Sequence, residues 1–339
     1  MPIIDHHNLR RVTQAIIEAA GTPRASALMV GDSLVEANLR GHDSHGVLRL
    51  PWYIDAVRRG VIVPDASPQV IAKHGATAQV DGALGWGQIA AHLATQTAIA
   101  LATEQGLGGV TIVNGNHIGR VGEYVEIIAR AGMIGIAMCN AGPAVAPYGG
   151  YQRVMGTNPL AWSAPRGPGQ VPLVLDFATS SVAEGKLRVA RSKGETLPPG
   201  LIVDAAGQPS RDPADFYAGG ALQTFGLHKG SGISLMIELL GRGLCGIDPA
   251  LPGHRGHNGT LILALHIPAF APEQQFLDAA ARLQEQVGAL SPIAGVDRVL
   301  LPGEPEQLAR RQRMSEGIPI PQPIWDDLVA LAAEWNIVV

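Results

Sequence analysis

The chain has 339 residues, of which 46% are hydrophobic and 16% charged. This balance predicts extensive burial, including at a subunit interface, and excludes a disordered protein. The net charge of −4 comes with no basic stripe, so nucleic acid is not expected as a partner. The N-terminal segment lacks the apolar region of a signal peptide, and no run approaches about 18 apolar residues, so we expect a cytoplasmic protein without a membrane span.

Both ends of the chain have helical patterns. Leu9, Val12 and Ile16 share one helical face, and Gly21 is expected to end that helix. Helical patterns return over 305–339, and this segment is expected to pack back on the N-terminal helices.

Between these ends, short apolar runs alternate with helical stretches. The runs are rich in β-branched residues, which favours buried strands, and the alternation predicts an α/β or α+β core. Strand-like runs cover residues 70–72, 110–113, 134–138, 173–175 and 260–265, and helical stretches cover residues 88–104, 124–131, 231–240 and 274–287.

The two cysteines, Cys139 and Cys245, both lie in apolar runs. Free cysteine is among the most buried residue types, and a chain with few cysteines is typical of a reducing compartment. The sequence therefore predicts two buried thiols. A catalytic cysteine is the alternative, although neither position resembles an exposed loop.

One formal dinucleotide fingerprint occurs, formed by Gly241, Gly243 and Gly246. It ends the apolar helical run 233–240 instead of joining a strand to a helix, so we interpret it as a helix C-terminus. No P-loop is present, and a dinucleotide-binding protein would need a phosphate site of another kind.

Residues 114–122 offer such a site, because they follow a strand-like run and precede a helical one. Their glycines let backbone amides approach an anion at a helix N-terminus, and Arg120 could add a charge-assisted hydrogen bond. The alternative is a glycine-rich turn. Residues 176–186 are similar, since their hydroxyls can cap a helix or bind ribose and phosphate.

Residues 40–53 gather polar side chains at a glycine break between helices. Arg49 and Tyr53 are four residues apart on the second helix and face the same side. Arginine grips a carboxylate with two hydrogen bonds, and a histidine such as His45 exchanges protons near neutral pH, with Ser44 able to hold the imidazole in one tautomer. The alternative is a polar surface turn.

Three further features allow a metal, a relay or an anion contact. A metal site from His42 and His45 lacks a third ligand at a suitable spacing, so no metal is predicted. Asp176 closes a strand-like run, where a carboxylate can orient a histidine or cap the segment that follows. Lys229 precedes an apolar helix at its positive end, where phosphate or carboxylate binds.

These segments, in this order, resemble the malate/L-lactate dehydrogenase family, whose fold is not a Rossmann fold. The residues of the first and last motifs, 41–53 and 301–320, are most similar to the hydroxycarboxylate dehydrogenase branch. The matching motifs are GHDSHGVLRLPWY (41–53), GNHIGRVGEY (115–124), MGTNPLAW (155–162), LDFATSSVAEGK (175–186), LHKGSGISLMIELLGRGLCG (227–246) and LPGEPEQLARRQRMSEGIPI (301–320).

The resemblance implies an α+β fold with two parts. Residues 1–75 together with 300–339 would form a helical domain, and 76–299 would form a cofactor-binding and dimerisation domain. The sheet of the second domain would be mixed, largely antiparallel and of non-Rossmann topology. The family also implies a homodimer with active sites near the subunit interface.

The resemblance further implies the roles of the site residues. His45 would be the proton donor and acceptor, with Ser44 and Asp176 as relay partners, while His117 competes for the same role in the ureidoglycolate branch. Arg49 would anchor the substrate carboxylate and Tyr53 would line the pocket. The cofactor would meet His117, Ile118, Gly119, Arg120, Val121, Ala178, Thr179, Ser180, Lys229, Pro302, Gly303 and Glu304.

The implied activity is hydride transfer between a nicotinamide cofactor and a small 2-hydroxy or 2-oxo acid. Glu184, Lys186 and Arg188 lie near the candidate ribose segment with conflicting signs, and the choice between NAD and NADP leans slightly to NAD. Reduction of cyclic Δ1-imino acids with NADPH is the first alternative, and a non-catalytic small-molecule-binding dimer is the second.

Overall fold

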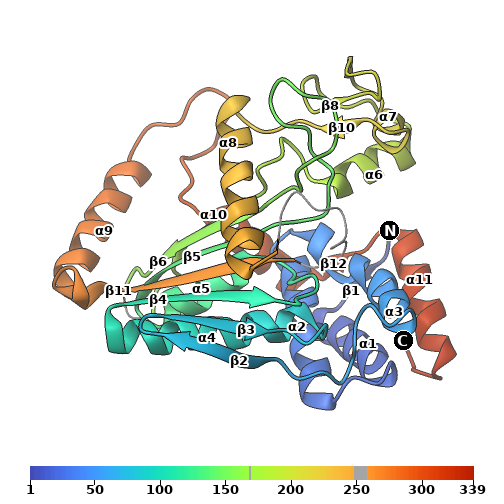
Figure 1. The fold of residues 1–339 in the computed structure, drawn as a ribbon. Helices are drawn as coiled ribbons and strands as arrows, with labels where there is room; N and C mark the ends of the chain where they lie inside the picture. The colour runs from blue at the N-terminus through green and yellow to red at the C-terminus, as the bar shows by residue number, and fades with distance from the viewer. Residues whose placement is uncertain (168, 248–257) are drawn as a thin grey trace.

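The computed structural model describes residues 1–167, 169–247 and 258–339. Figure 1 shows a central sheet, helices on both of its faces, a helical cluster at one end and a smaller lobe above.

Helices from both ends of the chain form the cluster beside the sheet (Figure 1). Its core buries Leu9 and Leu328 completely, as the helical periodicity predicted. Asp5 caps the first helix by accepting hydrogen bonds from the amides of His7 (2.9 Å) and Asn8 (3.0 Å). The cluster contains α1 (His6–Ala19), α2 (Arg24–Leu39), α3 (Leu50–Arg58), α11 (Gln322–Glu334) and the paired strands β1 (Ile3–Ile4) and β12 (Ile318–Pro319), and α10 (Glu304–Glu316) packs on α2.

The described residues contain a seven-stranded sheet in the order β2-β3-β4-β11-β5-β6-β7. β3 and β4 are parallel and all other neighbouring strands are antiparallel. At the centre, Ile262 lies between Val110 and Ala137, and all three are fully buried. The strands are β2 (Gln69–His74), β3 (Thr77–Asp81), β4 (Leu107–Val113), β5 (Met133–Cys139), β6 (Leu160–Ala164), β7 (Leu173–Phe177) and β11 (Thr260–His266).

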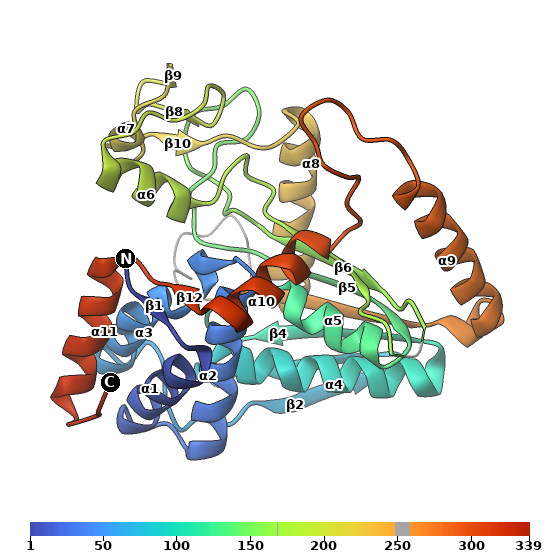
Figure 2. The same cartoon turned by 180° about the vertical axis from the view of Figure 1, so that it is seen from behind.

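Different helices cover the two faces of this sheet (Figure 2). α4 (Gly87–Gln105) and α5 (Gly122–Arg130) lie on one face, and α8 (His228–Ile237) lies on the other. α4 approaches β4 closely, because a Cβ on Gly108 would lie 2.0 Å from the carbonyl oxygen of Ala98. Glycine at this position therefore sets the distance between helix and sheet.

A smaller lobe lies above the sheet, with its own buried cluster around Leu187 and Phe216. The segment after α8 continues as a π turn (Glu238–Arg242) and a 3₁₀ turn (Gly243–Cys245), and Gly246 ends it with a φ of +73°. The interpretation of these glycines as a helix C-terminus is confirmed. The lobe contains α6 (Glu184–Lys193), α7 (Pro213–Tyr217), β8 (Ile202–Val203), β9 (Pro209–Ser210) and β10 (Ala221–Leu222), while α9 (Glu273–Gly288) lies at the far end of the large sheet.

The mixed sheet has a single parallel pair among its described strands, which is not the parallel arrangement of a Rossmann fold. All five strand-like runs and all four helical stretches of the sequence correspond to elements of this sheet and its helices. The sequence did not predict β3 and β6, and the boundaries proposed for the two domains stay a prediction.

Within the described residues, no helix is both long and apolar enough to cross a lipid bilayer. Nor does this part of the chain gather three or more histidine, cysteine, aspartate or glutamate side chains as a metal site would. Cys139 and Cys245 are both buried, as predicted, and burial raises the pKa of each thiol to about 11.

Candidate active site

Asn38 shapes the loop between α2 and α3 that carries the first site residues. Its buried side chain accepts a hydrogen bond from the Val47 amide (2.8 Å) and donates one to Asp43 (2.7 Å). A Cβ on Gly46 would lie 2.1 Å from the Asn38 oxygen, so glycine is required there. Arg313 of α10 also binds Asp43, at 2.6 Å, and the loop is therefore held from the C-terminal helix as well.

Ser44, His45 and Arg49 lie together on this loop. The Ser44 hydroxyl is 3.0 Å from Nδ1 of His45, and Nε of Arg49 donates to the Ser44 carbonyl oxygen (2.7 Å). The two terminal nitrogens of Arg49 make no hydrogen bond to the residues that the structure describes. They are therefore available to bind a carboxylate side by side.

His117 comes from the loop before α5 and lies against the same group. Its ring stacks on His45, with the centroids 5.6 Å apart and 10° between the ring planes. The Tyr53 hydroxyl is 2.8 Å from Nδ1 of His117, and Nε2 of Gln88 donates to the Tyr53 oxygen (2.9 Å). The Trp52 ring, 43% exposed, stands edge-on to His117 at 6.3 Å. The fold thus unites residues that are distant in sequence.

Burial and the Arg49 charge keep both histidines neutral at physiological pH. Burial lowers the pKa of His45 to about 3, with further contributions from Arg49 and His42. Burial and then Arg49 also lower the pKa of His117 well below its usual value. Burial raises the pKa of Tyr53, so its hydroxyl keeps its proton. The site therefore presents one cation beside two neutral imidazoles.

Asp176 lies at the N-terminus of α5. Its Oδ2 accepts a hydrogen bond from the Gly122 amide (2.7 Å), where the helix dipole favours a carboxylate. It therefore caps α5 and not the segment that follows it, which corrects that alternative. Within the described residues Asp176 makes no hydrogen bond to His45, and its role as a relay partner stays a prediction.

Backbone hydrogen bonds join the segments that were predicted to meet a cofactor. The Val174 amide donates to Pro302 (3.3 Å), and the Phe225 amide donates to Thr179 (3.0 Å). Lys229 follows in the first turn of α8, where its side chain is exposed and has no ion pair with a described residue. A free cation at a helix N-terminus suits a diphosphate, so these residues fit a dinucleotide.

Several residues that were predicted to contact the cofactor have side chains that are engaged elsewhere, so mainly their backbone atoms are available to it. The side chains of Ile118 and Val121 belong to the sheet core. The hydroxyls of Thr179 and Ser180 donate to backbone carbonyls at 3.0 and 2.9 Å. Gly303 has a φ of +87°, and its Cβ would lie 3.1 Å from a β7 carbonyl oxygen, so the turn that begins α10 lies directly on β7.

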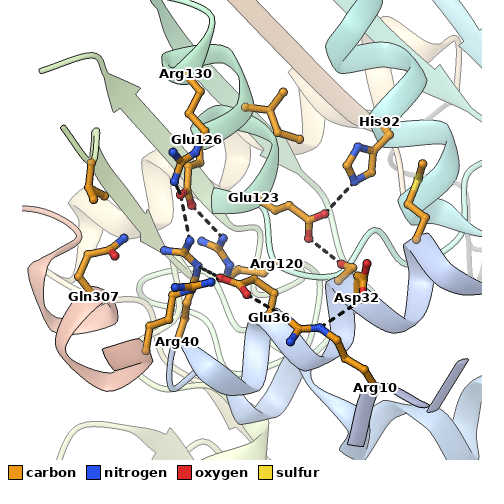
Figure 3. Close-up of a pocket in the computed structure, with 15 residues that line it drawn as sticks. Arg10, Asp32, Glu36, Arg40, His92, Arg120, Glu123, Glu126, Arg130 and Gln307 are labelled. Atoms are coloured by element: carbon orange, nitrogen blue, oxygen red, sulfur yellow. Dashed lines mark hydrogen bonds and ion pairs between the residues drawn. The ribbon is translucent and has the colours of Figure 1, made fainter. Parts of the chain in front are cut away.

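A charged cleft of about 710 Å³ is lined by residues of α1, α2, α4, α5 and α10. Figure 3 shows its charged side chains. Glu126 of α5 accepts hydrogen bonds there from Arg40 (2.9 Å) and Arg130 (2.7 Å), and Arg120 lies 3.5 Å away. Burial alone raises the pKa of Glu126, but Arg40 and Arg120 outweigh it and hold the pKa below its usual value. The described partner of Arg120 is thus a carboxylate, and its contact with a cofactor stays a prediction.

The Arg40–Glu126 ion pair joins the two elements that carry the histidines. Arg40 ends α2 shortly before His45, and Glu126 lies in the helix that follows His117. Both side chains are almost fully buried, at 7% and 6% exposed. The pair therefore connects the helical cluster to α5, which covers the sheet.

Three residues that shape this site could not be identified from the sequence. Gln88, Asn38 and Glu126 belong to no motif that points to chemistry, and each acts through a partner distant in sequence. Their burial is the signal that could have identified them, since buried polar side chains need partners. Burial becomes visible once the helices are packed.

The site can therefore bind a carboxylate on Arg49 and move a proton at a histidine, beside segments that suit a dinucleotide. Comparison with known proteins agrees with this chemistry. The chain matches the family model described as malate/L-lactate dehydrogenase over residues 4–329. It is 35% identical over 329 residues to a malate dehydrogenase from Pyrococcus abyssi, covering 94% of this chain and 90% of that protein.

Two further proteins are similar to this chain, one in sequence and one in structure. A Delta(1)-pyrroline-2-carboxylate/Delta(1)-piperideine-2-carboxylate reductase from Pseudomonas putida is 33% identical, with 92% of each chain covered. The structure of a putative malate/lactate dehydrogenase from E. coli superimposes with a TM-score of 0.93 at 33% identity, covering 100% of this chain and 96% of that one. Dehydrogenases of this family use a nicotinamide cofactor. The chain is a dehydrogenase or reductase and belongs to the malate/L-lactate dehydrogenase family.

Proposed function

We propose that this enzyme interconverts a small 2-oxo acid and its 2-hydroxy acid with a nicotinamide cofactor. The observation that carries the proposal is the stacked pair His45 and His117 beside the open end of Arg49. Arg49 would bind the carboxylate in this arrangement, and the two imidazoles would then stand beside the neighbouring carbonyl group.

Arg49 fixes the substrate carboxylate with its two terminal nitrogens, while its Nε stays on the Ser44 carbonyl. A bound nicotinamide cofactor supplies the hydride to C2 of the oxo acid. A histidine then neutralises the charge that develops on the carbonyl oxygen. His45 and His117 are the candidates for this proton transfer, and Ser44 orients His45.

Single His45→Asn and His117→Asn variants test these roles. The histidine that transfers the proton is expected to lower kcat by about 100-fold or more when replaced. The other variant should retain a pH-dependent kcat. If both variants reduce a 2-oxo acid at the wild-type rate, the proposed site is wrong.

The proposed cofactor is NAD, with a slight preference over NADP. Glu184 and Arg188 hydrogen-bond to each other (3.1 and 3.2 Å), and the Tyr217 hydroxyl donates to Glu184 (2.8 Å). Arg188 is thus engaged by a carboxylate, which disfavours its use for a 2′-phosphate. Initial rates with NADH and NADPH at equal concentration test this choice, and faster turnover with NADPH would reverse it.

Reduction of cyclic Δ1-imino acids is the second candidate, favoured by the similarity to the Pseudomonas putida reductase. The same carboxylate anchor would serve both substrates. The decisive experiment is a panel of malate-, lactate- and sulfolactate-type oxo acids alongside Δ1-piperideine-2-carboxylate, each with NADH and NADPH, followed by nicotinamide absorbance. Turnover of the imine alone would replace the first proposal with the second.

We also propose that the enzyme is a homodimer. On the sheet face that carries α8, Trp162 of β6 pairs with Leu175 of β7, and these side chains are 49% and 38% exposed. Leu235 and Met236 of α8 are more than half exposed. Such an apolar surface suits a subunit interface. Sedimentation equilibrium tests this proposal, and a monomer at micromolar concentration would contradict it.

A further inference from the structure

Nδ1 of His117 faces two hydrogen-bond groups. One is the Tyr53 hydroxyl at 2.8 Å and the other is the Gly119 amide at 3.4 Å. A backbone amide can only donate. Nδ1 must therefore hold its lone pair toward Gly119, and the proton of the neutral imidazole lies on Nε2.

Gln88 completes the same arrangement from α4. Its Nε2 donates to the Tyr53 oxygen (2.9 Å), which leaves the Tyr53 hydroxyl proton free to point at Nδ1 of His117. The reversed amide would accept the Tyr53 proton, and Tyr53 would then need a proton from Nδ1, in conflict with the Gly119 amide. The donor orientation of Gln88 is thus the one consistent with the backbone.

The burial of Gln88 indicates that it serves more than packing. The side chain is 0% exposed, and its Oε1 has no partner within the described residues. A buried acceptor without a partner costs stability, whereas an apolar side chain of similar volume would leave none. The amide is therefore retained at a cost where it contacts a site residue.

From this geometry we infer that Gln88 is a positioning residue, which acts through Tyr53 to lock His117 as a neutral imidazole with its proton on Nε2. Nδ1 is occupied by Tyr53 and Gly119, whereas Nε2 makes no hydrogen bond to a described residue. This inference rests on the proposed function for its consequence: Nε2–H donates a hydrogen bond to the carbonyl oxygen of the 2-oxo acid and stabilises the negative charge that forms there.

This tautomer of His117 also gives the two histidines different roles. A neutral imidazole whose Nδ1 accepts from a backbone amide cannot take up a second proton on that nitrogen, so His117 donates a hydrogen bond to the oxygen and is not the proton source. The hydroxyl at Nδ1 of His45, from Ser44 at 3.0 Å, can accept as well as donate. His45 is therefore the ring that can carry a second proton and deliver it to the substrate oxygen.

The tautomer can be measured without substrate or cofactor. In the full-length protein labelled with ¹⁵N-histidine, nitrogen–proton correlation spectra distinguish the protonated ring nitrogen from the lone-pair nitrogen, with His117→Asn used for assignment. The wild type is expected to carry the His117 proton on Nε2. A proton on Nδ1 in the wild type would overturn the proposal before any variant is made.

Gln88→Glu is the decisive variant, because a carboxylate accepts the Tyr53 proton and so favours the opposite tautomer. We expect the His117 proton to move to Nδ1 and kcat for oxaloacetate reduction to fall by about 100-fold, with a small change in KM. Gln88→Met should keep the proton on Nε2 and stay within about tenfold of wild type, since Tyr53 and Gly119 still donate. Gln96→Glu, the same change at an exposed position of α4, should alter neither measurement.

A merely structural role would make the Met and Glu variants equally slow and equally unstable, which would refute the assignment. An unchanged tautomer in a folded Gln88→Glu protein would refute it too. The expected tautomers without turnover of any 2-oxo acid would instead support the role of Gln88 and reject the proposed substrate class.

Discussion

Glu126→Gln tests whether the buried ion pair behind the site stabilises the enzyme. Arg40 and Glu126 are 2.9 Å apart and almost fully buried. The amide keeps the shape of the carboxylate but removes the charge that Arg40 and Arg120 share. Breaking such a pair on one side leaves an uncompensated buried charge.

The expected loss is large by comparison with a surface pair. Removal of one partner of a buried pair costs about 3 to 5 kcal/mol. An unfolding entropy of about 2.1 cal/mol/K per residue gives about 1.4 °C per kcal/mol for a chain of 339 residues, so the midpoint of thermal unfolding should fall by about 4 to 7 °C. Asp55→Asn is the matched control, because Arg59 and Asp55 are also 2.9 Å apart but are 57% and 58% exposed. That pair is worth about 0 to 1 kcal/mol.

Calorimetry or circular dichroism on both variants gives the comparison directly. The buried variant should also lose activity, because Arg40 and Glu126 hold together the elements that carry His45 and His117. If both variants unfold within about 2 °C of each other, burial does not set the strength of this pair and the reasoning fails. A more stable Glu126→Gln would contradict it further.

Three other outcomes follow from the site. Arg49→Lys should raise KM for the 2-oxo acid about tenfold or more with a smaller effect on kcat, since a point charge loses the paired grip, and an unchanged KM would reject Arg49 as the anchor. Gly46→Ala should unfold at a lower denaturant concentration and lose activity, because its Cβ would lie 2.1 Å from the Asn38 side-chain oxygen. Gly60→Ala is the control: its Cβ would have nothing within 4 Å, and only the strain of its φ of +70° should destabilise it. The pKa of His45, about 3 in the fold against 6.5 as a free side chain, means that the unfolded state takes up the proton first, so stability should fall by up to about 1.4 kcal/mol per pH unit below 6.5. Urea unfolding at pH 7 and pH 5 checks this, and His45→Asn should reduce the pH dependence without abolishing it, because burial also lowers the pKa of His117.

The sequence predicted elements well where the signal is local. Amphipathic periodicity identified the helical stretches, and β-branched runs identified five strands, because burial of one face leaves a repeat in the residues themselves. β3 was missed because Thr77–Asp81 is a short alternating segment and not a continuous apolar run, and β6 because Leu160–Ala164 contains small residues and one exposed tryptophan. Neither run has the composition of an isolated strand.

The arrangement of the site could be predicted in part. Ser44, His45, Arg49 and Tyr53 occupy one short segment, so their proximity follows from one turn of chain. The contact between Tyr53 and His117 spans 64 residues and depends on where α3 meets the loop before α5. The position of β11 between β4 and β5 likewise depends on long-range strand pairing. No local pattern in a single sequence indicates which strands will pair.

The electrostatics of the site link substrate binding to its protonation. Burial, and then the Arg49 charge, lower the pKa of both histidines, so the free enzyme holds two neutral rings. A carboxylate bound to Arg49 would offset that charge, and we expect the pKa of His45 to rise from its value in the free enzyme. His117 does not follow, because its Nδ1 already accepts from Tyr53 and Gly119. We therefore expect the second proton to enter on His45 when the carboxylate of a 2-oxo acid is bound to Arg49 and its keto group lies beside the ring.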